Sequence, residues 1–545
     1  MSEKMELYKD YFLIFLLVGL FIILIVFIIY PVLSLIQYGL ARQGIAGFIE
    51  VITNEKFVRV ILNTFFVSSA VTLISTGIGF VMAYLTDYLK IPGSRIIKSI
   101  FKLPLMVPTI VFALGFILVF GRMGTITRLL GGKWDIYGWQ GIVIADSLVY
   151  LPLAHMLLSS VLSNIDRSLE YAANSLGADD SQAFRTVILP LAAPGIANSA
   201  LLIFTKSLSD FGIPLILGGN FHVLSVEIYI QGMGLYRIDI ASFLALMLLI
   251  PSFALLFFQM FWLSKKTYIT VTGNPTQVEP RPVRGAVKWL SYMLLAIIGF
   301  LICSVYGSLF IDAFNKIPGL GFSFTLDNFK YMILQALDAL KNSLLVSALA
   351  VPICTITGIT IAYLIARRRF IGDNVLNALS MAPLAMPGVV IGIAYLLAFS
   401  KPPLLLTGTY LILVLCIAFR ELPYTVRTGL AALAQIDPSL EQSAVILSPS
   451  STSFRKVVLP LLGKAAMAGA TYTFLRSMTT LSAIIFLVSA GWRLFTIYIL
   501  DEIELANIGS ACALSVTLIL IVFMTMFIVN ILSKLLGLKE VGFQL

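Results

Sequence analysis

The stretch SNIDRSLEYAANSLGADDSQAFRTVILPLAAPGI (residues 163–196) returns in altered form as AQIDPSLEQSAVILSPSSTSFRKVVLPLLGKA (residues 434–465). Both stretches are polar connectors between long apolar runs, and each contains Leu-Pro just before the following run. A pattern of this length that occurs twice in one chain indicates an internal repeat. The two copies therefore predict a protein made of two related halves.

Other matched segments extend the repeat along the chain. Three of them share one spacing: Asn63-Thr64 with Asn342-Ser343, Ala83-Tyr84-Leu85 with Ala362-Tyr363-Leu364, and the prolines at 104 and 108 with those at 383 and 387. Between the halves, residues 265–288 are rich in polar residues, glycine and proline and lack apolar periodicity, which is typical of a linker. We predict a first half over 1–264, a cytoplasmic linker over 265–288 and a second half over 289–545.

Composition places the chain in a membrane. Of its 545 residues, 59% are hydrophobic and only 12% are charged, and the mean hydropathy is +0.98. Within a bilayer every backbone amide must be paired internally, so repeated apolar runs of about twenty residues form helices. We expect an all-α polytopic membrane protein with about twelve spans, in two six-helix halves related by an axis along the membrane normal.

The net charge of +10 has a topological explanation. The expected cytoplasmic loops hold about twenty Lys and Arg against roughly eleven outside, which is the bias that orients membrane proteins. The cluster Arg367, Arg368 and Arg369 is an example. We therefore expect lipid rather than nucleic acid around this chain, and a multi-pass membrane protein with both termini in the cytoplasm.

The first repeated loop is unusually ordered for a connector. Residues 165–176 have helical spacing, and Gly177 suits the end of a helix, where a residue without Cβ takes a positive φ at little cost. Asp179, Asp180 or Ser181 can cap a following short helix, and Pro190 marks the start of the next span. The predicted order is helix, tight turn, short helix and span, a shape that suits mechanical coupling to a partner.

These loops resemble the EAA motif of the permeases of binding-protein-dependent ATP-binding-cassette (ABC) importers. In the first loop the motif residues and their neighbours are Glu170, Ala172, Ala173, Gly177, Ala178, Asp179, Arg185 and Pro190; in the second loop they are Glu441, Ala444, Ser448, Arg455 and Pro460. The match is imperfect, because Tyr171 interrupts the first copy and Ser448 replaces the glycine in the second.

The resemblance covers both halves and implies a type I ABC importer permease fold. It implies a location in the bacterial cell inner (plasma) membrane. It also implies two separate ABC ATPase subunits docked on the two loops, and a periplasmic or lipid-anchored solute-binding protein. The permease itself would be no enzyme and hold no cofactor, with ATP and Mg²⁺ bound by the partner. Residues 207–219 and 383–399 are similar to iron(III) permeases, so iron(III) is the expected solute; thiamine, aminoalkylphosphonate, polyamine and sulfate remain alternatives.

Helix-breaking prolines and membrane-buried charges are the candidates for the solute path. Proline frees a backbone carbonyl, which a membrane tolerates only where protein or a water-filled cavity satisfies it, and a lone charge there costs several kcal/mol. The candidates are Pro104, Pro108, Lys206, Asp210, Pro383, Pro387 and Arg476. The alternative is that the prolines are packing kinks and that the charges form internal salt bridges with snorkelling cations.

The sequence lacks the motifs that would indicate other classes of function. His155 and His222 are too few and too far apart to suggest a metal site, and the four cysteines lie singly in apolar runs. A Walker A loop is missing, because Gly131-Gly132-Lys133 is followed by Trp134. An ion-coupled secondary transporter would not need paired docking loops, and a membrane-embedded enzyme would need clustered nucleophiles or metal ligands. Both alternatives are less favoured.

Overall fold

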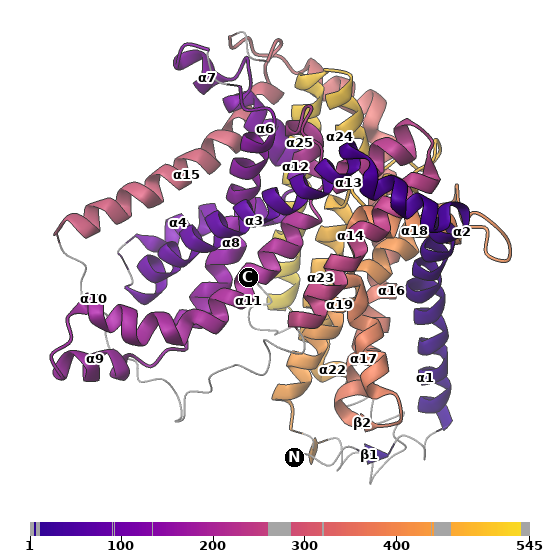
Figure 1. Cartoon of the computed structure of the whole chain (residues 1–545), viewed down its shortest axis with the longest axis horizontal. Coiled ribbons are helices and arrows are strands. Elements are labelled where there is room, and N and C mark those ends of the chain that lie inside the picture. Colours follow the sequence, from indigo (N-terminus) through magenta and orange to yellow (C-terminus); the bar gives the residue numbers. More distant parts are fainter. Residues whose placement is uncertain are drawn as a thin grey trace. The chain divides into compact units, whose positions relative to one another are not determined.

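Figure 1 shows the computed structural model of the chain, which is almost entirely helical in the part that it describes. That part is the whole chain except residues 1–4, 7–10, 90, 92, 133–134, 260–284, 319–320, 438, 441–458 and 536–545. Two short strands, β1 (Met5–Glu6) and β2 (Arg368–Arg369), pair in parallel. The predicted linker, 265–288, lies mostly outside the described residues.

The helices of the first half follow one another with few breaks. They are α1 (Tyr11–Leu24), η2 (Ile25–Ile29), α2 (Tyr30–Thr53), α3 (Glu55–Ala83), η3 (Tyr84–Tyr88), α4 (Ser94–Phe101), α5 (Leu103–Met106), α6 (Thr109–Phe120), α7 (Thr125–Leu129), α8 (Trp139–Ser163), α9 (Arg167–Ser175), α10 (Asp180–Ala183), η4 (Phe184–Ile188), α11 (Leu189–Leu208), α12 (Gly212–Leu217), α13 (Leu224–Tyr229), η5 (Ile230–Gly234) and α14 (Ile238–Phe258). The segments η2 to η5 are π-helical turns that continue the helices beside them.

The second half repeats this order in longer pieces. Its helices are α15 (Gly285–Ala313), α16 (Asp327–Arg367), α17 (Asp373–Met381), η8 (Ala382–Leu384), α18 (Gly388–Ala398), α19 (Tyr410–Gln435), α22 (Leu459–Leu461), α23 (Gly463–Thr479), α24 (Phe495–Glu504) and α25 (Ile508–Leu535). The helix α16 takes the place of α3, α19 that of α8, α23 that of α11 and α25 that of α14, as the matched segments of the sequence predict.

The spans agree with the expected membrane architecture. Among the described residues, nine helices are long and apolar enough to cross a membrane, and the bent pair of α17–η8 with α18 makes a tenth. The helix α19 fails that test because it carries Arg420, Glu421 and Arg427, and α23 because it has only 17 residues. By their places in the repeat these two complete a set of about twelve, and 17 residues is still within the length that a span needs.

Close helix contacts repeat between the halves. A Cβ added at Gly79 of α3 would lie 2.5 Å from the Ala154 Cβ of α8, and one added at Gly358 of α16 would lie 2.7 Å from Thr425 Cγ2 of α19. Gly79 and Gly358 stand at matched positions of the repeat. Glycine lets two helix backbones approach in a membrane, where small residues mark helix interfaces. The repeat therefore extends from sequence to packing.

The chain forms two compact units that do not follow the sequence halves. One unit comprises Met1–Glu50, Ile228–Leu249 and Phe329–Leu545; the other comprises Val51–Glu227 and Ile250–Asn328. Each unit therefore combines the core helices of one half with the first span of the other half. The boundary at 265–288 stays a prediction about sequence organisation.

In the unit that holds the second-half core, α1 and η2 pack on α17 and α19. The Tyr395 hydroxyl donates a hydrogen bond of 2.6 Å to the Phe27 carbonyl. The Phe27 ring stacks on Phe419 at 4.9 Å between centroids and lies 5.7 Å from Phe399. This contact pairs a carbonyl in the π-helical turn η2 and buries a large aromatic ring, which stabilises the association of α1 with this core.

In the other unit, α15 packs in the same way on α6 of the first-half core. The Ser308 hydroxyl donates to the Gly115 carbonyl at 3.2 Å, and a Cβ on Gly115 would lie 2.5 Å from the Val305 carbonyl oxygen. The Tyr306 ring meets Phe112 edge to face at 5.9 Å. Phe27 and Tyr306 stand at matched positions of the repeat, so the exchange of first spans is reciprocal.

Candidate functional site

The first loop has the local structure that its sequence predicts. The Asp166 carboxylate caps α9 by accepting the Ser168 amide at 2.9 Å. Gly177 ends the helix with φ of +97°, and the next amide, of Ala178, donates back to the Ala173 carbonyl at 3.1 Å. A left-handed residue after the last turn pairs otherwise unsatisfied carbonyls, and glycine does so without a Cβ penalty. The helix and its glycine end are confirmed.

The surface of α9 is largely open. The helix buries none of its residues, and Leu176 at its end is 91% exposed. Ala172 is exposed, and Glu170 and Ala173 are half-buried. An exposed leucine at a polar helix end costs solvation free energy unless another surface covers it. The helix therefore offers a small, mixed apolar and polar surface.

Tyr88, at the end of η3, holds α9 in place. Its hydroxyl donates a 2.6 Å hydrogen bond to Glu170 Oε2, and the Arg167 guanidinium lies over its ring, 4.6 Å from the centroid. Arg167 also donates to the Tyr88 carbonyl. Glu170, predicted as a docking residue, is thus turned toward the end of the α3–η3 span. Sequence reasoning missed Tyr88 and Arg167, although Arg167 lies one helical turn before Glu170.

Aromatic rings extend this contact to the next span. Tyr84 stacks on Tyr88 at 5.3 Å and meets Phe184 of η4 edge to face at 5.2 Å. Phe80 lies 6.2 Å from Phe184. The end of α3 therefore contacts both α9 and the helix that leaves the loop. A displacement of α9 cannot leave these two spans unaffected, because all three share packed side chains.

A buried polar cluster lies beside these rings. The Thr86 hydroxyl is 2.8 Å from His155 Nε2 and donates to Asp87 Oδ2 at 2.7 Å. Asp87 Oδ2 also lies 3.3 Å from His155 Nε2, and Lys98 of α4 pairs with Asp87. His155 is only 8% exposed. The cluster joins η3, α4 and α8 and gives His155 a packed, hydrogen-bonded role.

The segment after Gly177 differs from prediction in one respect. Asp179 caps α10 in a reciprocal capping box, accepting the Gln182 amide at 2.7 Å while Gln182 Oε1 accepts the Asp179 amide at 3.1 Å. The predicted separate short helix is wrong, because one helix continues from Asp180 to Leu208. The π-helical turn η4 shifts the hydrogen-bond register just before Pro190, so the missing proline amide does not stop the helix. Arg185 and Pro190 are both exposed.

The second loop begins as the first does. Asp437, at the position matched to Asp166, accepts the Ser439 amide at 2.8 Å, and this amide lowers the pKa of the Asp437 carboxyl. Arg367 stands where the first half has Tyr88, and its guanidinium donates to the Leu433 and Ile436 carbonyls at 3.0 and 2.5 Å. Pro460 is exposed in α22. The remaining candidates of this loop, Glu441, Ala444, Ser448 and Arg455, lie outside the described residues.

The paired prolines start helices rather than kink them. Pro108 has φ and ψ of −57° and 142°, and Pro387 has −57° and 144°, each just before the first residue of α6 or α18. Pro104 and Pro383 are buried in the short helical turns that precede them. Between α17–η8 and α18 the chain bends by 110°. The second proline of each pair therefore has the same backbone conformation and precedes the same helix in both halves.

The candidate charges have different environments in the two halves. In the first, Asp210 follows α11, accepts the Ile213 amide at 3.1 Å and receives the Tyr150 hydroxyl at 3.3 Å. Lys206 is half-buried, and its carbonyl lies 3.4 Å from the Tyr150 hydroxyl. Asp146, which sequence reasoning missed, is fully buried in α8 and accepts the Ser207 hydroxyl at 3.1 Å. Its position as a charge within an apolar run was the available signal.

In the second half, one carboxylate lies between two arginines. Glu421 Oε1 is 3.7 Å from Arg420 Nε, and Glu421 Oε2 is 3.8 Å from Arg476 Nε. Arg420 also donates to the hydroxyl of Thr480, the residue matched to Asp210. Arg476 therefore belongs to an internal ion pair, as the alternative interpretation predicted. The halves share a backbone plan and differ in the charges that it carries.

Known proteins match both the order and the repeat described above. The family described as "Binding-protein-dependent transport system inner membrane component" matches residues 75–269 and again 358–538. The ferric transport system permease protein FbpB of Actinobacillus pleuropneumoniae is 34% identical over 94% of this chain and 77% of the relative. A putative ferric transport system permease protein FbpB 1 of Haemophilus influenzae is 34% identical over 90% of this chain and 80% of the relative.

A third relative matches only part of the chain. The sulfate transport system permease protein CysT of Escherichia coli is 30% identical over 41% of this chain and 83% of the relative. The resemblance inferred from the two loops and the matched halves is thus confirmed by comparisons that cover most of the sequence. The chain belongs to the family of inner membrane components of binding-protein-dependent transport systems, and it contains the family's domain twice.

Proposed function

We propose that this protein is the membrane-spanning permease of an ATP-driven importer for iron(III). The observation that carries the proposal is the similarity, over nine-tenths of the chain, to two relatives named as ferric transport permeases. The sulfate permease covers less than half of the chain, so sulfate is less favoured, as are thiamine, aminoalkylphosphonate and polyamine. The chain supplies the path for the solute and no bond chemistry.

Coupling is proposed to occur at α9 and at the matched loop of the second half. Each would dock one ABC ATPase subunit, which binds ATP and Mg²⁺. The open surface of α9, the exposed Leu176 and the aromatic contacts of Tyr84 with Tyr88 and Phe184 support this role. Closure of the ATPase pair would move α9, and the packed rings would pass that movement to two spans.

This arrangement also assigns the sides of the membrane. The loops with α9 and Asp437 would face the cytoplasm, and both termini would lie there as well. A periplasmic or lipid-anchored binding protein would deliver the solute to the opposite face. The paired prolines Pro104, Pro108, Pro383 and Pro387 would shape the path, and Asp210 with Lys206 would lie along it in the first half alone. Arg476 is left as a structural partner of Glu421.

The Gly177→Val substitution tests the coupling assignment. Valine at a left-handed position costs about 1–2 kcal/mol in backbone strain, which would disturb the end of α9 without touching the spans. We expect the stimulation of ATP hydrolysis by the solute-loaded binding protein to fall about tenfold in reconstituted complexes. The matched control is Gly93→Val: Gly93 also has a positive φ, of +81°, and open space around its Cβ, but lies before α4.

Two results would reject parts of the proposal. If Gly177→Val and Gly93→Val leave ATPase docking and stimulation equally intact, α9 is not the coupling helix. If the binding protein that stimulates hydrolysis retains thiamine, a phosphonate, a polyamine or sulfate on purification, iron(III) is not the solute. These two readouts are independent of each other.

A further inference from the structure

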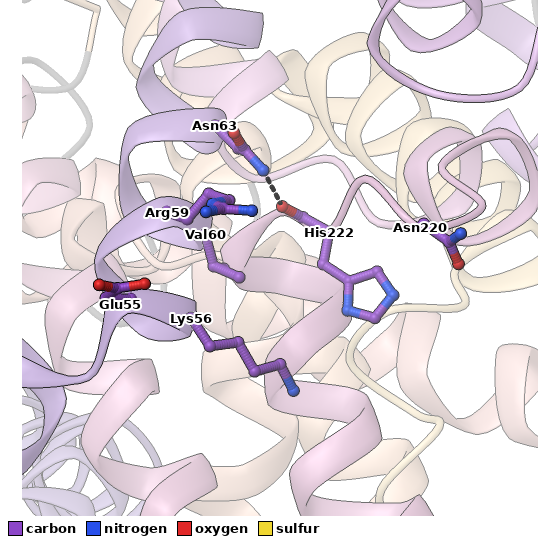
Figure 2. Close-up of a pocket in the computed structure, with 7 residues that line it drawn as sticks. All are labelled: Glu55, Lys56, Arg59, Val60, Asn63, Asn220 and His222. Atoms are coloured by element: carbon purple, nitrogen blue, oxygen red, sulfur yellow. Dashed lines mark hydrogen bonds between the residues drawn. The ribbon is translucent and has the colours of Figure 1, made fainter.

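A polar pocket lies at the opposite end of α3 from α9. It has a volume of about 390 Å³ and is formed by the first turns of α3 and the loop between α12 and α13. Figure 2 shows Lys56 and Arg59 extending from α3 toward the loop that carries Asn220 and His222, with Glu55 on the other side of the α3 ribbon. None of these residues has a role in the proposed function.

A buried carboxylate organises the pocket. Glu227 of α13 is fully buried, and its two oxygens lie 2.5 Å from Lys56 Nζ and 2.9 Å from His222 Nδ1. The Asn63 amide donates to the His222 carbonyl at 3.0 Å, which holds the loop against α3 (Figure 2). A buried carboxylate paired to two nitrogen donors is costly to disrupt. The positions of Lys56 and His222 are therefore fixed before any ligand arrives, which reduces the entropy cost of binding.

We propose that this pocket binds a small anion through carboxylate or similar oxyanion groups. Arg59 is exposed and lines the pocket, and among the described side chains no carboxylate lies within salt-bridge distance of it. The Arg59 guanidinium and the Asn220 amide offer donors that carboxylates and phosphates accept. Lys56 and Asn63 add the N–H groups that they do not use on Glu227 and the His222 carbonyl. A cation is disfavoured, because the positive side chains of Lys56 and Arg59 both line the pocket.

The corresponding surface of the second half lacks these donors. Leu334, Gln335 and Asp338 stand where the first half has Glu55, Lys56 and Arg59. The cation matched to His222 is Arg493, which pairs with Asp501 at 3.2 Å. Asn342 keeps the backbone role of Asn63, donating to the Arg493 carbonyl at 3.2 Å. The shared scaffold is thus retained in both halves, and the anion-binding side chains occur in the first half alone.

The inference deepens the proposed function and rests on it for its location. If α9 faces the cytoplasm, the start of α3 faces the side on which the binding protein arrives. An anion bound there could come free from solution, or it could arrive as an oxygen ligand of the iron. Both sources present the same carboxylate chemistry to Arg59 and Lys56.

Isothermal titration calorimetry on the full chain in nanodiscs, without ATPase and at low ionic strength, tests the inference. Citrate and inorganic phosphate are the probes. We expect citrate to bind, and Arg59→Gln to weaken it about tenfold, since one charge-assisted contact is lost. Arg493→Gln is the matched control, because it removes an arginine from the corresponding loop of the other half, and it should leave citrate binding unchanged.

A comparison of citrate with iron(III) citrate separates the two sources. Tighter binding of the complex that is lost in Arg59→Gln identifies an anion carried with iron; equal binding identifies a free anion. The inference is overturned if the wild-type protein binds neither probe, or if Arg59→Gln and Arg493→Gln bind citrate as well as it does. Because the ATPase is absent, this result does not depend on the Gly177→Val experiment, and either proposal can fail alone.

Discussion

The residues at matched positions 88 and 367 contact their loops through different chemistry. In the first half, the Tyr88 side chain bonds to Glu170 and lies under Arg167, so the contact depends on which side chains α9 carries. In the second half, Arg367 stands in place of Tyr88 and donates to the Leu433 and Ile436 carbonyls. A contact to backbone tolerates changes of loop sequence, whereas a contact to side chains does not.

This difference explains where the two loops diverge in sequence. The caps Asp166 and Asp437 are the same residue with the same bond to an amide two positions on. Beyond them, the first loop keeps the glutamate, alanines and glycine of the EAA pattern, and the second replaces the glycine by Ser448. The halves are therefore alike in the caps and contacts that build the fold and unlike in the sequence of the loops that follow the caps.

The largest expected effect concerns a feature that both halves share. Gly79→Leu and Gly358→Leu should each destabilise the protein strongly, by about 3 kcal/mol or more, because the new side chain would overlap the facing helix. Thermal unfolding in detergent should show a similar fall in Tm for both. Gly77→Leu is the control, since a Cβ at Gly77 meets no atom within 4 Å. If only one of the two substitutions lowers Tm, the packing of α3 on α8 is not equivalent to that of α16 on α19.

The next effect should separate the halves. Tyr88→Phe keeps the ring under Arg167 and removes the bond to Glu170, so local opening of α9 should increase about tenfold, as expected for a hydrogen bond to a charged group. Hydrogen exchange of residues 167–175 measures it. Arg367→Met should instead raise exchange at 433–440 and leave α9 unchanged. If either substitution loosens both loops equally, the two contacts are not local.

The smallest effect concerns the two asparagines at the far ends of α3 and α16. Asn63→Ala removes one hydrogen bond to a loop carbonyl and Asn342→Ala removes two, at a cost of about 1 kcal/mol for a well-formed bond. Because the hydrogen bonds of Asn342 are open to solvent and, at 3.2 and 3.3 Å, are longer than the 3.0 Å bond of Asn63, its substitution should lower Tm less. Equal falls in Tm would mean that the hydrogen bond between His222 and Glu227 adds no stability to the His222 loop.

Much of this architecture could be read from the sequence. The repeat, the helix end at Gly177 and a cap at Asp179, Asp180 or Ser181 were predictable because each depends on local backbone rules that a few residues carry. The matched prolines predicted breaks in the helices for the same reason. The number of spans could be predicted approximately because it depends on the length of the apolar runs, even where charges such as Arg420 and Glu421 interrupt a run.

The rest depends on contacts between distant residues. Tyr88 has no motif of its own. Its role depends on a contact with Glu170, which is 82 residues further along the chain and comes close only in the folded protein. The exchange of first spans could not be predicted, because α1 and α15 are apolar on most sides. Their sequences therefore do not indicate which helices they pack against. Asp146 could not be placed from the sequence because its partner Ser207 lies on another span, 61 residues further along the chain.

The exchange of first spans has a consequence for biogenesis. During translation α1 enters the membrane long before Phe399 and Phe419, the residues that its Phe27 packs on, have been made. The core that begins at Val51 likewise waits for α15, which is synthesised after the stretch joining the halves. Neither unit is complete until residues from both halves of the sequence have been synthesised. A split of the gene between the halves would therefore yield two fragments that must find each other in the bilayer before either one is whole.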